Sequence, residues 1–116
     1  MQLAKASTRY VRISPRKARY AAALIRGLPV DQATHQLLYS KLRGGRLLKK
    51  TLDSAVANAE TQLDVRRESL KVHEVRVDAG PILRRAKARS KGSSVPVNKR
   101  TSHFTIVLVA EQGKGA

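Results

Sequence analysis

Cysteine and tryptophan are absent from the chain, and its aromatic side chains are limited to three tyrosines and one phenylalanine. Without cysteine, neither a disulfide nor a cysteine-ligated zinc site can form. No apolar run approaches the length of a transmembrane helix, and the first residues lack the apolar core of a signal peptide. We therefore expect the 116 residues to form one soluble, cytoplasmic domain with a modest core.

Acidic residues are scarce, because 8 Asp and Glu stand against 24 Lys and Arg, giving a formal net charge of +16. Residues 1–30 contain no acid, and no acid lies between Asp78 and Glu111. Such an imbalance indicates a polyanionic partner. Proteins that read single strands interleave aromatics with cations, so the few aromatics favour recognition of the backbone and shape of a folded nucleic acid.

The second acid-free stretch is the most informative part of the chain. Four of its cations fall at every second position, so an extended strand presents them on one face: Arg85, Lys87, Arg89 and Lys91. Gly92 and the two serines after it favour a turn. We interpret residues 80–103 as a basic β-hairpin arm that projects from the body. A disordered charged loop is the alternative, and the strand-like runs on both sides argue against it.

The rest of the chain predicts an α+β domain, with a three-stranded, mostly antiparallel sheet packed on three helices. Strands are expected at residues 8–13, 70–78 and 104–110, and helices at 16–26, 31–40 and 42–63. Ser14 and Pro15 are typical of a helix start, and Asp31 is expected to cap the second helix. In the second strand, Leu70 and Val72 are expected on one face and Val75 and Val77 on the other. The expected core also includes Leu24, Ile25, Leu37, Leu38, Leu48, Leu52, Val56, Phe104, Ile106 and Leu108.

Cations also crowd the first predicted strand and helix. Arg16, Lys17 and Arg19 fall in the first turns of the helix, where the helix dipole disfavours positive charge. Arg9 and Arg12 lie just upstream. An ordinary solvated face is the alternative, but the local cost favours contact between these side chains and an external anion.

Residues with catalytic chemistry are few. His35, His73 and His103 are the only histidines, and none is spaced from another histidine or a glutamate as metal ligands are. His103 has no second histidine or paired carboxylate nearby in sequence to support general acid–base chemistry. We expect no enzymatic activity, no metal and no cofactor.

Several separate motifs resemble the family of bacterial-type large-subunit ribosomal protein L twenty-two, and the resemblance covers nearly the whole chain. They are R-Y-V-R-I-S-P-R-K-A-R at residues 9–19, L-I-R-G at 24–27, S-A-V-A-N-A-E at 54–60, V-D-A-G-P at 77–81 and K-R-T-S-H at 99–103. The resemblance implies a structural protein of the large ribosomal subunit, with a hairpin that lines the nascent-peptide exit tunnel. It also implies that the protein helps the ribosomal RNA to assemble.

The implied partners are several domains of large-subunit ribosomal RNA, neighbouring large-subunit proteins and the nascent peptide in the tunnel. The free protein is expected to be a monomer, and an organellar origin is left open. The RNA-binding residues are expected to be Arg9, Arg12, Arg16, Lys17, Arg19, Arg84, Arg85, Lys87, Arg89, Lys91, Lys99, Arg100, Thr101, Ser102 and His103. The tunnel-lining part of the arm is expected to comprise Leu83, Arg84, Arg85, Ala88, Arg89, Lys91, Gly92 and Ser93.

One alternative from another functional class is a DNA-architectural protein that wraps a duplex with basic β-arms. Such proteins insert an apolar wedge at the arm tip and are usually obligate dimers. The tip here is K-G-S-S at residues 91–94, which is a poor wedge.

Overall fold

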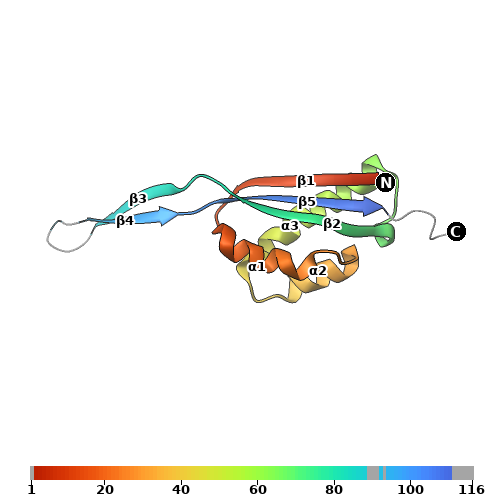
Figure 1. The fold of residues 1–116 in the computed structure, drawn as a ribbon, viewed down its shortest axis with the longest axis horizontal. Helices are drawn as coiled ribbons and strands as arrows, with labels where there is room; N and C mark the ends of the chain where they lie inside the picture. The colour runs from red at the N-terminus through yellow and green to blue at the C-terminus, as the bar shows by residue number, and fades with distance from the viewer. Residues whose placement is uncertain (1, 89–91, 93, 111–116) are drawn as a thin grey trace.

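The computed structural model describes residues 2–88, 92 and 94–110. Three helices and a three-stranded antiparallel sheet form the body, and two further strands form the arm (Figure 1). The helices are α1 (Pro15–Ile25), α2 (Val30–Tyr39) and α3 (Arg43–Gln62). The strands are β1 (Gln2–Val11), β2 (Leu70–Ala79), β3 (Leu83–Ala88), β4 (Ser94–Lys99) and β5 (Ser102–Ala110), with a 3₁₀ helix at Arg67–Ser69. The predicted α+β fold is confirmed.

The sheet has the order β1-β5-β2, and the helices pack on one of its faces. The central strand β5 contributes Phe104, Ile106 and Leu108, which are fully buried. The helices meet it with Ile25, Leu37, Leu48, Leu52 and other apolar residues of one continuous core. Burying these side chains is what offsets the conformational entropy lost on folding.

Helix α1 begins and ends where the sequence predicts. The Ser14 Oγ accepts a hydrogen bond from the Lys17 backbone N–H at 3.3 Å, and Pro15 occupies the first turn. Gly27 follows the helix with a φ of 82°, a left-handed conformation that suits glycine. The buried stripe of α1 consists of Ala18, Ala21, Ala22 and Ile25, as predicted.

Two leucines expected in the core are exposed: Leu24 at 40% and Leu38 at 52%. Each directly precedes or follows a residue of the buried stripe, so the 3.6-residue period turns its side chain away from the core. Asp31 also differs from expectation. It lies within the first turn of α2, whose N-cap is Pro29. These three predictions were wrong in detail, although the helices themselves are confirmed.

Strand β2 contains one extra residue, which overturns the prediction for its two faces. The pairing with β5 shifts in register between Val72 and Glu74. A single inserted residue reverses the alternation of side chains beyond it. Leu70, Val72, Val75 and Val77 are therefore all buried on the helix-covered side of the sheet.

Strand β1 is longer than the predicted residues 8–13, because it begins at Gln2. Its first part alternates between exposed residues and the small buried residues Ala4 and Ala6. Its register with β5 shifts between Thr8 and Val11. Within that shift Tyr10 has a φ of 60°, which is uncommon for a residue other than glycine.

The predicted arm is present as the antiparallel pair β3 and β4, with a register running from Leu83 opposite Lys99 to Ala88 opposite Ser94. It extends beyond the body (Figure 1), and the molecule measures 72 × 25 × 16 Å. Its radius of gyration is 17.5 Å, whereas a compact domain of this length would have about 13 Å. Arg85, Lys87 and Ala88 lie in β3, but the structure describes only the backbone of these three residues. The predicted contact residues Arg89, Lys91 and Ser93 lie outside the described residues.

Candidate nucleic-acid interface

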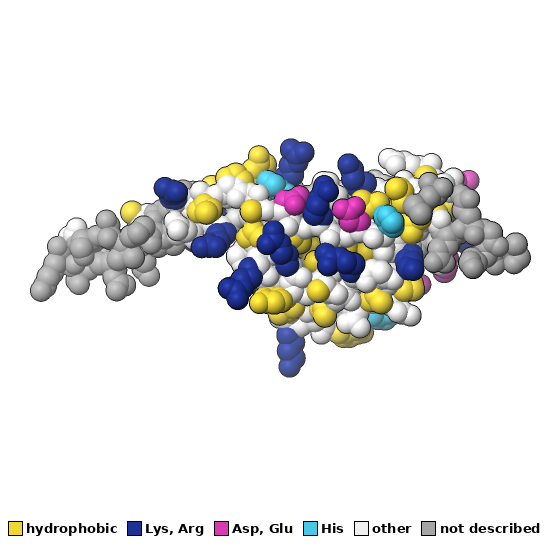
Figure 2. All heavy atoms as spheres, viewed as in Figure 1, with side chains coloured by type: hydrophobic (Ala, Val, Ile, Leu, Met, Phe, Trp, Pro, Cys, Tyr) yellow, Lys and Arg dark blue, Asp and Glu magenta, His cyan; other side chains and the backbone are white. Residues whose placement is uncertain are grey.

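Positive charge collects over α1 and the neighbouring sheet, with a few acidic side chains among it, on the face drawn in Figure 2. The N-terminal part of the chain is rich in cations, since residues 2–30 contain seven Lys and Arg and no Asp or Glu. Some of these cations are hydrogen-bonded within the protein and others are not. A paired cation is partly neutralised, whereas an unpaired one attracts an anion from outside.

In the body, four of the predicted contact residues carry charges that no described residue pairs. Arg9 lies at the end of β1, Arg12 precedes α1, and Arg16 and Lys17 lie in the first turn of α1. All four are exposed. Within the described part of the chain, their charged groups have no hydrogen-bond or ion-pair partner. Because no acidic residue lies in the first turn of α1, these cations are placed to meet an external anion.

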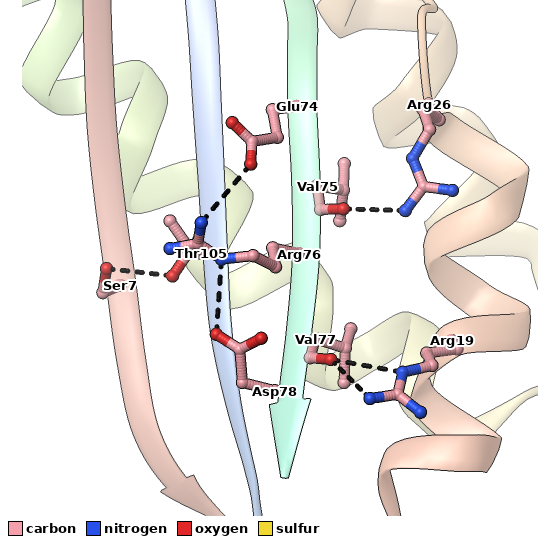
Figure 3. Close-up of polar contacts among 9 residues, drawn as sticks. All are labelled: Ser7, Arg19, Arg26, Glu74, Val75, Arg76, Val77, Asp78 and Thr105. Carbon is pink, nitrogen blue, oxygen red and sulfur yellow. Dashed lines mark hydrogen bonds and ion pairs between the residues drawn. The ribbon is translucent and has the colours of Figure 1, made fainter.

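Arg19 has a different role from the other cations of α1, as Figure 3 shows. Its Nε and Nη2 donate to the Val77 carbonyl at 3.2 and 3.0 Å. About two turns further on, the Arg26 Nη2, in the residue that follows α1, donates to the Val75 carbonyl at 2.7 Å. Both carbonyls belong to β2, an edge strand. The two arginines thus cover the edge of the sheet that would otherwise be open to pairing.

The other edge of the sheet is covered in the same way, since the Asn58 Nδ2 on α3 donates to the Lys5 carbonyl of β1 at 3.0 Å. On the face of the sheet without helices, Arg76 lies between two acids (Figure 3). Its guanidinium is 3.6 Å from the Glu74 carboxylate and 3.3 Å from that of Asp78. This part of the surface is therefore less attractive to an anion than the start of α1.

Two residues of the K-R-T-S-H motif join the base of the arm to the body by side-chain hydrogen bonds. The Ser102 Oγ donates to the Ile13 carbonyl, and the Thr101 Oγ1 donates to the Pro81 carbonyl, both at 2.7 Å. Both residues are buried, at 0% and 3% exposure respectively. Their side chains hold the arm to the body. The expectation that these two side chains contact RNA disagrees with their burial.

Pro81 and Gly80 also belong to this junction between the arm and the body. Pro81 has no N–H, so it cannot continue the ladder between β2 and β5, and the hydroxyl of Thr101 supplies a donor to its carbonyl instead. The Gly80 N–H donates to the Thr101 carbonyl at 3.0 Å. A Cβ on Gly80 would lie only 2.5 Å from the Thr101 Oγ1 and 3.1 Å from the His103 ring. A side chain at this position would force the strands apart.

His103 joins the arm base to the strained segment of β1. Its Nδ1 accepts a hydrogen bond from the Tyr10 backbone N–H at 3.1 Å. The two rings meet edge to face, with centroids 5.0 Å apart. His103 is thus a positioning residue at the junction, half-buried beside the exposed Arg9.

Within the arm, Arg84, Lys99 and Arg100 are exposed, and Leu83 is half-buried. No described side chain between Ile82 and Arg100 is buried. None of the described side chains of the arm therefore belongs to the core of the protein. A segment of this kind is stabilised by what it binds rather than by its own packing.

Other kinds of site are not supported in the described part of the chain. It holds no group of three or more His, Cys, Asp or Glu residues arranged to bind a metal ion. None of its helices is long and apolar enough to cross a membrane.

Comparison with known proteins decides the family. A sequence model of the ribosomal protein L22p/L17e family matches residues 6–109. The chain belongs to this family. The matched residues run from β1 to β5 and include those of the arm. Its membership makes the chain a structural ribosomal protein rather than an enzyme.

Several proteins named large ribosomal subunit protein uL22 are similar to this chain along almost their whole length. The large ribosomal subunit protein uL22 of Protochlamydia amoebophila is 68% identical over 108 residues, which is 93% of this chain and 97% of that protein. The uL22 of Chlamydia abortus is 58% identical over 104 residues, or 90% and 94% of the two chains. That of Chlamydia muridarum is 56% identical over 110 residues, or 95% and 98%.

The sequence reasoning missed some basic residues of α3 in its set of contacts. Arg43 and Arg46 are exposed, and no described residue pairs with their charges. Arg43 lies beside Lys17 in one surface pocket, although 26 positions separate them in the sequence. The two glycines that follow Arg43 could have indicated from the sequence that another element packs here, because a buried glycine in a helix allows a close approach.

Proposed function

We propose that this protein is a structural component of the large ribosomal subunit that binds large-subunit ribosomal RNA with one continuous domain, residues 1–116. The single observation that carries the proposal is the set of unpaired, exposed cations at Arg9, Arg12, Arg16 and Lys17, beside the base of the projecting arm. Phosphate oxygens are the partners that such a set fits best, because each contact releases a condensed counterion.

The family and its relatives support the same role. The relatives are named as proteins of the large ribosomal subunit, and the similarity covers 94–98% of their length. Neighbouring ribosomal proteins are further partners in this proposal. The DNA-architectural alternative loses its support, because the chain belongs to a ribosomal protein family.

The arm has the finer role of reaching into the particle and lining the tunnel through which the nascent peptide leaves. What supports this is its shape and surface: it is long, basic at Arg84, Lys99 and Arg100, and free of described core residues. The arm should contact RNA along its sides and the nascent peptide near its tip, where Arg89, Lys91, Gly92 and Ser93 are proposed to lie along the tunnel. Before assembly the protein is a monomer in this proposal.

Salt dependence tests the RNA interface. Neutralising about six phosphates gives a slope on the order of −4 to −5 in a plot of log affinity against log salt, at roughly −0.7 to −0.9 for each phosphate. The measurement is filter binding of the purified protein to a transcript of bacterial large-subunit RNA, across a range of potassium chloride. A slope near −1 would contradict an extended basic footprint.

Photocrosslinking tests the tunnel separately. A benzoylphenylalanine at Ala86, an exposed position of β3, should crosslink both to large-subunit RNA and to a stalled nascent chain. The same group at Ser54, exposed on α3, is the matched control and should not reach the nascent chain. Equal labelling of the nascent chain from both positions, or from neither, would count against the tunnel role. Sedimentation equilibrium of the free protein tests the monomer.

A further inference from the structure

A surface pocket of about 360 Å³ lies between the start of α1 and the start of α3. It is formed by three parts of the chain that come together only in the fold: the segment before α1, the exposed side of α1 and the first turn of α3. Its lining residues are Ile13, Ser14, Lys17, Tyr20, Leu42, Arg43 and Gly44. The volume is within the range of sites that hold small ligands.

The pocket exists because α3 lies unusually close to α1. Gly44 is buried, and a Cβ placed on it would lie 3.3 Å from both the Ala18 Cα and the Ile13 Cδ1. That contact is tighter than side chains normally accept, so glycine is what allows the first turn of α3 to approach α1. The close approach places Arg43 beside Lys17 and Tyr20.

The charges in the pocket are of one sign and are unused within the protein. Neither Lys17 nor Arg43 has an ion-pair or hydrogen-bond partner for its charged group among the described residues. No Asp or Glu lines the pocket. Two unpaired cations on one rim fit a single phosphate group, which accepts several charge-assisted hydrogen bonds.

The remaining surface of the pocket is aromatic and apolar. Tyr20 is 57% exposed, and Leu42 is also exposed. The other two tyrosines have ring partners: Tyr39 stacks on His35 at 5.9 Å, and Tyr10 meets a histidine edge-on. Tyr20 has no such partner in the described structure, so the faces of its ring are available. A flat aromatic ring beside cations is what proteins use to bind unpaired bases.

Two neighbouring pockets lack this combination. The one lined by Leu24, His35 and Tyr39 contains no Lys or Arg. The one on the open face of the sheet contains the unpaired Arg9, but it also contains Asp78, and its two rings are the buried Phe104 and His103, which already meets Tyr10. Of these three pockets, the one between α1 and α3 alone joins unpaired cations to a free aromatic ring.

We propose that this pocket binds one unpaired nucleotide of the large-subunit RNA, with its base stacked on Tyr20 and its phosphate held between Lys17 and Arg43. The proposal rests on the RNA-binding function proposed above. It adds a contact with a base to an interface otherwise made with the RNA backbone.

The test uses the full-length protein and a transcript of bacterial large-subunit RNA. Tyr20→Ala should weaken binding by about 5-fold to 150-fold, the range that stacking of one base on an aromatic ring supplies, with little change in the salt slope. Tyr20→Phe should retain the affinity, because the ring remains. The double change Lys17→Gln with Arg43→Gln should flatten the slope by about 0.7–0.9, the value of one phosphate, because the two side chains share it. Lys50→Gln, an exposed control on α3 outside the pocket, should leave the effect of Tyr20→Ala unchanged.

The outcomes separate this proposal from the broader one. If wild-type protein binds RNA with a steep slope but Tyr20→Ala binds equally well, the nucleotide pocket is refuted and the RNA interface stands. If Tyr20→Ala keeps its RNA affinity yet fails to enter large subunits, the pocket serves a neighbouring protein and the proposal is again wrong. A wild-type protein that binds RNA weakly and without salt dependence refutes the RNA function itself. Circular dichroism of each variant verifies that it is folded.

Discussion

Replacing Ser102 by alanine tests whether this residue holds the protein together or contacts a partner. In the structure its hydroxyl is fully buried and donates to the Ile13 carbonyl at 2.7 Å. Alanine fits the same space without strain, so the change removes one hydrogen bond and leaves a carbonyl without that donor. Loss of a buried partner in this way costs about 1–3 kcal/mol.

That cost is large enough to measure in a small domain. For a chain of 116 residues, 1 kcal/mol lowers the melting temperature by about 4 °C, so the middle of the range predicts a fall of roughly 8 °C. Thermal unfolding followed by circular dichroism provides the measurement. Ser54→Ala is the matched control, because Ser54 is exposed on α3 and such surface changes stay within about 0.5 kcal/mol.

RNA binding of the same variant completes the test. At a temperature where the protein is fully folded, Ser102→Ala should bind large-subunit RNA as tightly as the wild type. A melting temperature within about 2 °C of wild type, combined with weaker RNA binding, would show that the hydroxyl faces the RNA and that the structural reasoning is wrong.

Three further predictions follow from the same contacts. Gly80→Ala should lower the melting temperature, measured by circular dichroism, by at least about 4 °C. The added Cβ would lie 2.5 Å from the Thr101 hydroxyl oxygen, and overpacking of this kind costs about 1–3 kcal/mol. An unchanged melting temperature would show that the arm base is loosely packed. The double change Arg16→Gln and Lys17→Gln should weaken RNA binding in filter assays without altering the melt. In contrast, Arg19→Gln should also lower the melting temperature, because its guanidinium donates hydrogen bonds to β2. If all these variants changed RNA binding and the melting temperature equally, the distinction between RNA-binding and structural cations would be contradicted. Replacing residues 85–97 by a short Gly-Ser turn should leave the melting transition nearly unchanged in calorimetry, and a collapsed transition would show that the arm belongs to the core.

Helix α1 could be predicted almost completely from the sequence because its signals are local. A capping serine, a proline in the first turn and a glycine after the last turn all fall within residues 14–27 and agree with one another. Its apolar stripe gave the correct buried face, apart from Leu24. The arm was equally accessible, since alternating cations and turn residues between two apolar runs are a local pattern too.

The features that sequence reasoning missed depend on pairing between distant residues. The extra residue in β2 reverses the faces of Val75 and Val77. The three-residue spacing between Val72 and Val75 marks the place, but the sequence alone does not decide between an inserted residue and two faces. Ser102 looked like a contact residue because it belongs to a basic motif, whereas its hydroxyl donates to Ile13, 89 positions away. The same limit applies to Arg19, whose acceptor lies 58 positions away on β2.

The candidate site shows the same division. The unpaired cations of the first turn of α1 could be identified from charge patterning alone, because no acid lies near them in sequence. The pocket shared by Lys17 and Arg43 could not, since it requires the close approach of two helices at Gly44. A sequence reports which charges are available, and only the fold determines which of them meet.

A structure of the large ribosomal subunit carrying this chain tests the central claim most directly, namely that the unpaired cations of the body and arm are the RNA-binding surface. We expect the charged groups of Arg16 and Lys17 to lie within hydrogen-bond distance of RNA phosphates and the arm to enter the particle. We also expect the Thr101 and Ser102 hydroxyls still to donate to the Pro81 and Ile13 carbonyls. A subunit in which those cations face solvent while the two hydroxyls contact RNA would contradict it.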